Sequence, residues 1–211
     1  VGVPFRNRQL ALTICEDLWN VGASPIYKRR PLDELSGARP DLILNIAASP
    51  FSRQQPQIRG EVLATNARHY QAPLVYVNHV GAQTELIFDG HSTVYNAQGQ
   101  CVRKLAAFEE DFGCFDTDTL TAMPAVDPPA AMATEEAHFK ALVLGLRDYF
   151  TKLGFKKALL GMSGGIDSAL VHALAAEALG PEQVLAVLMP SRYSTEGSVV
   201  DARKQGENIG G

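Results

Sequence analysis

Short apolar runs between polar residues divide the first part of the chain into predicted strands and one helix. Residues 9–14, 41–48 and 73–80 are each apolar over the length of a buried strand. Between the last two runs, residues 57–70 place four apolar or aromatic side chains near helical spacing: Ile58, Val62, Ala67 and Tyr70. The pattern predicts strand, helix and strand in that order, which is typical of an α/β fold.

After Gly81 the apolar runs become shorter and are separated by turn residues. Runs of strand composition cover residues 85–88, 92–95, 101–106 and 112–116. The turn sequence NAQGQ between the second and third runs predicts a hairpin. The α/β region is therefore expected to end in a strand-rich segment that reaches to about Asp118.

Residues 121–134 have the composition of an extended linker, with three Pro and five Ala among few charges. We expect this linker to separate a first domain, residues 1–120, from a second that begins at residue 135. Thr134 is placed to cap a helix, and Glu135 and Glu136 fall in its first turn, where the helix dipole favours acidic side chains.

Residues 135–211 have the pattern of the start of a parallel α/β domain. An apolar stripe at helical spacing ends before Gly154 and comprises Phe139, Leu142, Val143, Leu146 and Phe150. A strand at 157–162, a glycine-containing turn, a helix at 168–180 and a strand at 184–190 then follow. Strand, helix and strand in this order predict a βαβ unit with a parallel sheet.

Composition and charge narrow the class of protein. Hydrophobic residues make up 46% and charged residues 20% of the 211 residues, which is typical of a globular protein and excludes collagenous and disordered classes. A formal charge of −4 gives no field that would attract nucleic acid, and no apolar run approaches the roughly 20 residues that span a bilayer. We therefore expect neither nucleic acid nor membrane as a partner.

The three cysteines, Cys15, Cys101 and Cys114, form no CxxC pair, which favours a reducing cytoplasm over an oxidised disulfide framework. Cys101 and Cys114 fall in predicted strands and are expected in the core. The chain begins without Met and stops just after a predicted helix, so we expect a fragment of a longer protein.

The sharpest chemical signal lies between a predicted strand and a predicted helix. It comprises Ser163, Gly164, Gly165, Ile166, Asp167 and Ser168. Two adjacent glycines let a ligand approach the backbone amides, and the helix N-terminus attracts phosphate. Asp167 suits such a site if Mg²⁺ lies between its carboxylate and the phosphates. The alternative is an ordinary tight turn in which Ser and Asp cap the helix.

A second signal is Cys15, directly after the strand predicted at residues 9–14. In an open α/β sheet, reacting side chains gather at the edge where the strands end. A nucleophilic cysteine there requires a nearby base or cation. The alternative is a small buried core residue.

The glycine-containing turn and its flanks, LLGMSGGIDSALVHALAAEALG, resemble the PP-loop of ATP pyrophosphatases, and with LMPSRYST they are most similar to the synthetase domain of NAD synthetases. The resemblance implies a Rossmann-like fold that binds ATP and cleaves it between the α and β phosphates. It implies ATP binding by residues 163–168, with Mg²⁺ at Asp167.

LTICEDLW, LNIAASPF and the segment from Tyr76 to Gly99 together resemble a nitrilase-type amidohydrolase, in particular the glutaminase domain of glutamine-dependent NAD synthetases. The resemblance implies part of an αββα sandwich, with Cys15 as nucleophile, the Glu16 amide at the oxyanion and Ser49 at the glutamine. Asp89 and His91 either shape that pocket or form a structural turn. The family's Glu base and Lys lie upstream of the cysteine, and neither residue type occurs in residues 1–14, so the fragment is not expected to form the complete triad.

Together, the two resemblances imply a ligase that takes its amide nitrogen from glutamine. Cys15 would release ammonia, and ATP with Mg²⁺ would adenylate deamido-NAD, which ammonia converts to NAD with release of AMP and pyrophosphate. Family members form homo-oligomers, so we expect one here. Two alternatives remain open: another PP-loop amidotransferase such as a GMP synthetase, and a non-catalytic interaction fragment whose sites are incomplete.

Overall fold

The computed structural model describes residues 1–21, 27–37, 40–120, 122–127, 132–192 and 194–210. These residues form two compact units, which are described separately below. The first contains residues 1–81 and 86–137, and the second contains residues 82–85 and 138–211. The assignment of residues 1–120, 121–134 and 135–211 to domains and a linker stays a prediction.

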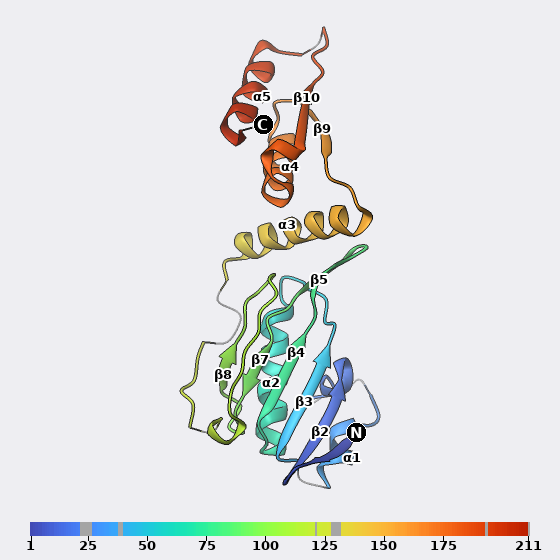
Figure 1. Cartoon of the computed structure of the whole chain (residues 1–211), viewed down its shortest axis with the longest axis vertical. Coiled ribbons are helices and arrows are strands. Elements are labelled where there is room, and N and C mark those ends of the chain that lie inside the picture. The colour runs from blue at the N-terminus through green and yellow to red at the C-terminus, as the bar shows by residue number, and fades with distance from the viewer. Residues whose placement is uncertain (22–26, 38–39, 121, 128–131, 193, 211) are drawn as a thin grey trace. The chain divides into compact units, whose positions relative to one another are not determined.

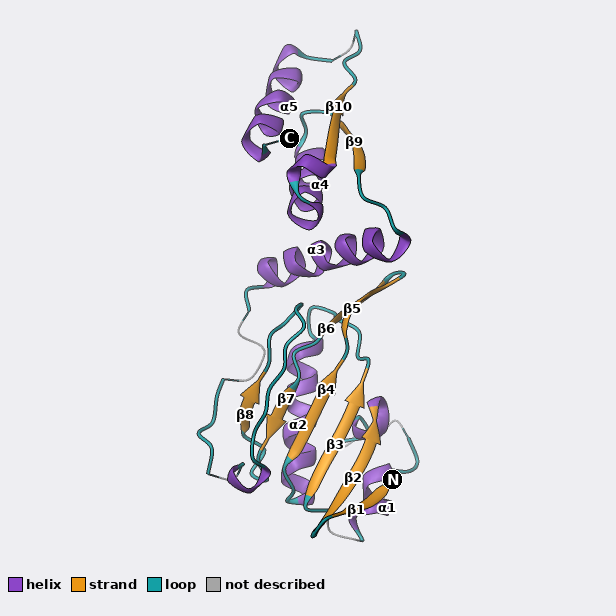
Figure 2. Cartoon of the chain, in the orientation of Figure 1, coloured by secondary structure: helices purple, strands orange, loops and turns teal. Residues whose placement is uncertain are grey.

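The first unit is built on one mixed sheet of six strands, shown in Figures 1 and 2. In spatial order the strands are β1 (Gly2–Phe5), β2 (Arg8–Ile14), β3 (Leu42–Ala47), β4 (Leu74–Asn78), β7 (Thr93–Tyr95) and β8 (Cys101–Lys104). β2, β3 and β4 are parallel, and the remaining neighbours are antiparallel. The parallel strands therefore end at one common edge, where ligands bind in open α/β sheets.

Helices and short strands connect the strands of this sheet. The 3₁₀ turn η1 (Cys15–Leu18) and α1 (Pro31–Ser36) follow β2, and the long helix α2 (Gln55–Tyr70) joins β3 to β4. β5 (Val80–Gln83) and β6 (Leu86–Asp89) pair with each other, and a second 3₁₀ turn, η2 (Thr117–Thr119), follows β8.

The main core of the first unit lies between the sheet and its helices. Apolar side chains from α2, α1 and η1 pack on one face of the sheet, which includes Tyr76. The helix side chains in this core are Leu18, Leu32, Val62, Leu63 and Ala67. These side chains come from the connection after β2, which contains η1 and α1, and from the connection after β3, which contains α2. Both connections therefore pack on the same core, and this holds η1 and the ends of β2 and β3 in place.

The opposite face of the sheet is covered over only part of its area. Leu120 packs there against Leu42, Val94 and Val102, with Phe115 and Met123 at the margin. Other apolar side chains of the same face are exposed by 71% at Ile14, 67% at Ile46 and 50% at Val77. The carboxyl ends of β2, β3 and β4 thus present an uncovered apolar surface on this side.

The second unit contains most of a long helix and a βαβ arrangement. Its elements are α3 (Thr134–Leu153), β9 (Ala158–Met162), α4 (Ile166–Leu179), η4 (Pro181–Gln183), β10 (Val184–Leu188) and α5 (Glu196–Ile209). β9 and β10 pair in parallel, with Leu188 opposite Met162. This confirms the predicted βαβ unit, because α4 connects the two strands.

The predicted α/β class and most of the predicted elements are confirmed, but four details are wrong. Residues 112–116 form no strand, and Cys114 is exposed rather than buried. Ile58 is 41% exposed, because the buried face of α2 is turned toward Arg59 instead. α3 begins at Thr134 itself, so Ala133 occupies the capping position.

The predicted linker is described in part. Residues 122–127 and 132–133 form neither helix nor strand, and residues 121 and 128–131 lie outside the described residues.

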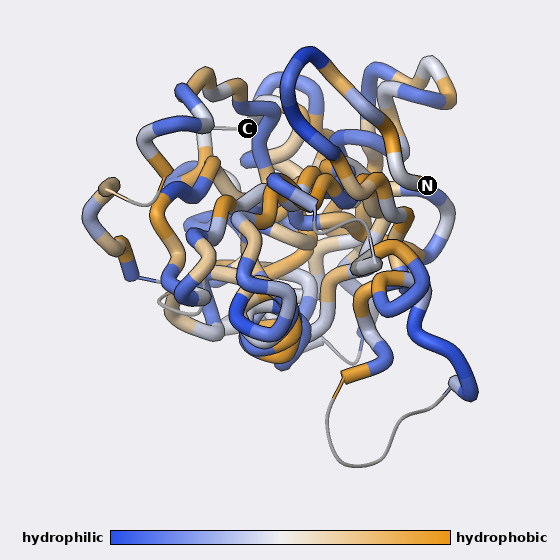
Figure 3. Tube along the Cα trace, turned by 90° about the horizontal axis from the view of Figure 1, so that it is seen from below, coloured by the Kyte–Doolittle hydropathy of each residue, from blue (hydrophilic) through white to orange (hydrophobic). Residues whose placement is uncertain are grey.

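Hydrophobic and hydrophilic residues alternate in short stretches along the trace of the chain in Figure 3. Within the described part of the chain, no helix has the length and apolarity needed to cross a membrane.

Candidate active sites

The first candidate site lies at the edge where the three parallel strands end. Cys15 directly follows β2, Ser49 lies two residues beyond β3, and Asn78 is the last residue of β4. The strand register pairs Ile14 with Ile46 and Ala47 with Asn78, so all three polar residues lie at one edge. The predicted position of Cys15 directly after a buried strand agrees with this arrangement, and the role of Ser49 at the glutamine stays a prediction.

Cys15 has the backbone of a sharp strand-to-helix turn. Its φ is +44°, in the left-handed region that residues with a Cβ rarely adopt. The Asp17 carboxylate accepts a hydrogen bond from the Ile14 N–H at 2.8 Å and closes the turn across Cys15. A strained turn of this kind projects a nucleophile from the end of a strand in α/β hydrolases. The thiol is free and partly exposed.

The residues next to Cys15 also fix the turn. The Asn45 side-chain amide donates to the Cys15 carbonyl at 3.4 Å and to the Thr13 hydroxyl at 2.9 Å. The Glu16 carboxylate accepts a hydrogen bond from the Tyr27 hydroxyl at 2.6 Å, which raises the pKa of Tyr27. The Glu16 amide lies in the first turn of η1, where helical N–H groups have no partner within the helix. That amide is therefore suited to hold an oxyanion.

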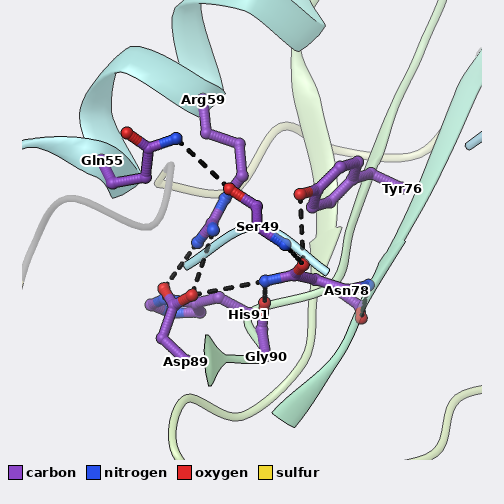
Figure 4. Close-up of polar contacts among 9 residues, drawn as sticks. Ser49, Gln55, Arg59, Tyr76, Asn78, Asp89, Gly90 and His91 are labelled. Carbon is purple, nitrogen blue, oxygen red and sulfur yellow. Dashed lines mark hydrogen bonds and ion pairs between the residues drawn. The ribbon is translucent and has the colours of Figure 1, made fainter. Parts of the chain in front are cut away.

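Ser49 belongs to a buried polar network, which is drawn in Figure 4. It is 3% exposed, and its hydroxyl accepts a hydrogen bond from the Gln55 amide at 3.2 Å. Its backbone N–H donates to Asn78 Oδ1 at 3.0 Å, and the Tyr76 hydroxyl donates to the same oxygen at 3.3 Å. Burial raises the pKa of Tyr76, so its hydroxyl stays protonated and remains a donor.

Asn78 connects this network to a buried ion pair. Its side-chain amide donates to the Gly90 carbonyl at 2.8 Å and to Asp89 Oδ1 at 3.3 Å. Asp89 accepts two hydrogen bonds from Arg59, at 3.0 and 2.5 Å. Burial opposes the charge on Arg59, but the hydrogen bonds and the charge of Asp89 outweigh it, so the pKa of Arg59 is raised.

His91 lies beside the ion pair and is mostly buried. Its Nδ1 is 3.9 Å from Asp89 Oδ2, which is too long for a hydrogen bond. Burial lowers the pKa of His91 despite the opposing attraction of Asp89, so its imidazole is neutral near pH 7. Both interpretations of Asp89, as a residue that shapes the pocket and as a structural residue, fit this arrangement. Asp89 is buried, as a structural residue would be, and it is connected to Ser49 through Asn78.

The second candidate site is the turn between β9 and α4 in the second unit. The Ser163 hydroxyl accepts a hydrogen bond from the Gly165 N–H at 3.2 Å and lies 3.1 Å from the Ser168 hydroxyl. Ser168 also donates to the Gly165 carbonyl at 3.0 Å. The two hydroxyls therefore hold the turn closed at the N-terminus of α4, where unpaired N–H groups attract anions.

Two features of position 164 require glycine: its backbone conformation and the atoms that surround it. Its φ is +82°, and a Cβ at this position would clash with the Ser198 carbonyl in the first turn of α5. Ile166 and Asp167 are exposed in the first turn of α4, with Ile166 80% exposed. The Asp167 carboxylate is thus open to solvent beside the turn.

The geometry brings the predicted residues into two groups, one in each unit. The sequence-based reasoning missed Asn78, Tyr76 and Arg59 in the first group. The signal for Arg59 was its place on the buried face of α2, three residues before Val62 and four before Leu63. An arginine at such a position requires a buried anion. Among the described residues, no cluster of three or more His, Cys, Asp or Glu side chains could hold a metal ion.

Known proteins resemble this chain over its whole length. Residues 138–211 match the family model described as NAD synthase. The glutamine-dependent NAD(+) synthetase of a Synechocystis species is 42% identical over 98% of this chain and 38% of its own length. The enzyme of that name from Thermotoga maritima is 36% identical over 99% of this chain and 41% of its own length.

A solved structure of glutamine-dependent NAD⁺ synthetase from Acinetobacter baumannii, in complex with ADP, superposes on the whole chain with a TM-score of 0.87 and 36% identity. The alignment covers 39% of that structure. The chain therefore spans about two fifths of the length of the relatives that it matches.

Proposed function

We propose that this chain, which is homologous over its whole length to glutamine-dependent NAD(+) synthetases, supplies the nucleophile of a glutaminase site and the nucleotide-binding turn of a ligase site. The observation that supports this most directly is the left-handed backbone of Cys15 at the end of β2. Backbone strain of this kind clusters at active sites. Among the described non-glycine residues with positive φ, Cys15 is the one with a thiol.

In the glutaminase reaction, the Cys15 sulfur attacks the side-chain amide carbon of glutamine. The new S–C bond forms first and moves the C=O electron pair onto oxygen, which gives a tetrahedral oxyanion. The oxyanion then collapses and the C–N bond breaks, and the leaving nitrogen takes the proton that the thiol gave up and departs as ammonia. The Glu16 N–H stabilises the oxyanion, and Ser49 binds the glutamine. Water then attacks the thioester, which releases glutamate and returns the thiol.

In the ligase reaction, residues 163–168 bind the phosphates of ATP at the N-terminus of α4. The nicotinate carboxylate of deamido-NAD attacks the α-phosphorus and displaces pyrophosphate, and ammonia then attacks the acyl carbon and displaces AMP, which gives NAD. A Mg²⁺ ion would be held by the exposed Asp167 carboxylate together with phosphate oxygens of bound ATP, and carboxylate and phosphate oxygens are ligands that Mg²⁺ prefers. When bound, the ion neutralises phosphate charge.

The same proposal assigns residues 1–120 to a nitrilase-like glutaminase domain, residues 121–134 to the linker and residues 135–211 to the start of the ATP-binding domain. A second sheet of an αββα sandwich would bury the exposed Ile14, Ile46 and Val77. Cytoplasmic location and assembly into a homo-oligomer are further parts of the proposal.

The test separates the two nitrogen sources in the full-length protein. Cys15→Ala is expected to abolish NAD formation with glutamine and to preserve NAD formation with ammonia. Cys114→Ala, an exposed cysteine outside both sites, should preserve both activities and serves as the control. Loss of both activities in a folded Cys15→Ala protein would contradict the proposal, and so would continued use of glutamine.

A further inference from the structure

We propose that Arg59, Asp89 and Asn78 are positioning residues for glutamine, which act by fixing the loop that contains Ser49. This inference rests on the proposed glutaminase reaction, because it concerns how Ser49 reaches the substrate. The three residues and Ser49 are called the polar network below. Figure 4 shows their contacts.

The loop after β3 is held by contacts with other elements. Residues 48–54 belong to no helix or strand. The Ser49 N–H donates to the side chain of Asn78 at 3.0 Å, and the Phe51 N–H donates to the Ile87 carbonyl at 2.7 Å. The position of Ser49 therefore depends directly on which way the Asn78 side chain faces.

A side-chain amide has two possible orientations, which exchange its oxygen and its nitrogen. In the observed orientation, Asn78 Oδ1 accepts from Ser49, and Nδ2 donates to Asp89 and Gly90. The reversed orientation would turn a donor toward the Ser49 N–H and an oxygen toward the Asp89 carboxylate. The oxygen would also face the Gly90 carbonyl. All of these contacts would be unfavourable, so Asp89 and the Gly90 carbonyl together select the orientation that holds Ser49.

Arg59 in turn fixes the position of Asp89. The side chains of this pair are 3% and 1% exposed, and two hydrogen bonds join them. A guanidinium is always charged, and its two donors match the two carboxylate oxygens, so Arg59 holds Asp89 in one orientation. The Arg59 guanidinium also lies 5.7 Å from the ring of Tyr76, the second donor to Asn78.

The mostly buried imidazole next to the pair is His91, which is neutral near pH 7. It adds no positive charge that would compete with Arg59 for Asp89. The charge of the polar network therefore comes from Arg59 and Asp89, and its effect reaches Ser49 through the amide of Asn78.

The main test uses Asn78→Leu in the full-length protein, because leucine keeps the branching of the asparagine side chain and removes both hydrogen-bonding groups. We expect the KM for glutamine to rise about threefold to tenfold, the effect of one ordinary hydrogen bond, with little change in kcat. The rate with ammonia should stay at the wild-type value. Asn96→Leu is the matched control, because Asn96 is 1% exposed in the same unit and bonds only within its own turn among the described contacts.

A labelling experiment separates the binding of glutamine from the reactivity of the thiol. Asn78→Leu should slow the labelling of Cys15 by a diazoketone analogue of glutamine and leave its labelling by iodoacetamide unchanged. In a Ser49→Ala background, Asn78→Leu should raise the KM no further, because effects that act through one residue are not additive. If Asn78→Leu does not fold, Arg59→Lys gives the second test: it keeps the charge, loses the paired hydrogen bonds and should raise the KM in the same direction.

The outcomes distinguish this inference from the proposed function. Wild-type protein that releases no glutamate from glutamine would contradict the glutaminase proposal itself. If the wild-type protein consumes glutamine, equal KM values for Asn78→Leu and Asn96→Leu would overturn the inference alone. Equal slowing of the two labelling reagents, or an unchanged KM in Arg59→Lys, would also overturn it.

Discussion

Arg59 and Asp89 form an ion pair with two hydrogen bonds and almost no exposure to solvent, although 30 residues separate them along the chain. Arg59 comes from α2 and Asp89 from the end of β6. The pair therefore joins the helix that covers the sheet to the segment after β4. It also fixes the charged carboxylate of Asp89 next to Asn78, which holds the loop that contains Ser49.

Breaking this pair on one side should strongly destabilise the protein. Asp89→Ala leaves the Arg59 charge buried without a partner, and we expect a loss of about 3–5 kcal/mol in the free energy of unfolding. Replacing both residues together, as Arg59→Met with Asp89→Leu, should cost less than the sum of the single changes. Urea unfolding of the full-length protein measures each value. Arg29→Ala, at an exposed ion pair with Glu34, is the control and should have no measurable effect.

The backbone strain at Cys15 should be visible as a difference between two substitutions. Cys15→Gly should be more stable than Cys15→Ala by roughly 1 kcal/mol, because glycine adopts a positive φ without a steric cost. Cys101 lies in β8 and is absent from the residues with positive φ. The same two substitutions at Cys101 should give the opposite order, with glycine less stable. The same order at both positions would argue against strain at Cys15.

Gly164 should not tolerate a side chain. Gly164→Ala adds a Cβ that clashes with the Ser198 carbonyl at a positive φ, and we expect a loss of about 1–3 kcal/mol in stability together with weaker ADP binding. Gly206 lies within α5 with no atom near its absent Cβ, so Gly206→Ala should instead stabilise by roughly 0.5–1 kcal/mol. Urea unfolding and ADP titration calorimetry measure both effects. Unchanged ADP affinity in a folded Gly164→Ala protein would count against the turn as the phosphate site.

The proposed metal role of Asp167 gives a prediction about magnesium. Asp167→Asn should reduce the gain in ADP affinity that Mg²⁺ produces and leave the affinity without Mg²⁺ unchanged or slightly higher, because a negative charge near the phosphates is removed. Asp201→Asn on α5, also exposed, is the control. An undiminished effect of Mg²⁺ on Asp167→Asn would rule out this carboxylate as a ligand.

His172 should make the stability of the protein depend on pH. It is fully buried in α4, neither ring nitrogen has a hydrogen-bond partner among the described residues, and burial lowers its pKa below 6.5. As the pH falls below 6.5, the unfolded chain binds a proton that the folded chain does not, so stability decreases toward the folded-state pKa. His172→Leu should therefore lose less stability between pH 7.5 and about 5.5 than the wild-type protein does.

The control for this pH dependence is Leu174→Ala, which changes a buried residue of the same helix that does not titrate. The urea midpoint of Leu174→Ala should fall between the two pH values as much as that of the wild-type protein. If His172→Leu showed the same fall as Leu174→Ala, the buried imidazole would not be the titrating group.

Much of the fold was predictable because its signals are local. The apolar runs at 9–14, 41–48 and 157–162 correspond to β2, β3 and β9, since a buried strand needs consecutive apolar residues. Residues 112–116 have a similar composition but form no strand, because strand composition does not supply a neighbouring strand with which to pair.

In the candidate sites too, local features could be predicted from the sequence and contacts between distant residues could not. The turn at Ser163–Ser168 and the position of Cys15 at the end of a strand could be predicted, because each depends on a few adjacent residues. Asn78 could not be identified as the partner of Ser49, because that contact depends on the register of β3 against β4.

The sequence by itself determined where strands and helices form, where the chain turns sharply and which residues stand at those turns, since each follows from backbone preferences and apolar periodicity within one segment. Only the tertiary structure decided that Arg59 rather than Ile58 points inward, that Asp89 is its partner and that their charge reaches Ser49 through Asn78. The physical reason is that a buried charge is stable only beside its counter-charge, and the packing of α2 against the sheet brings the two together.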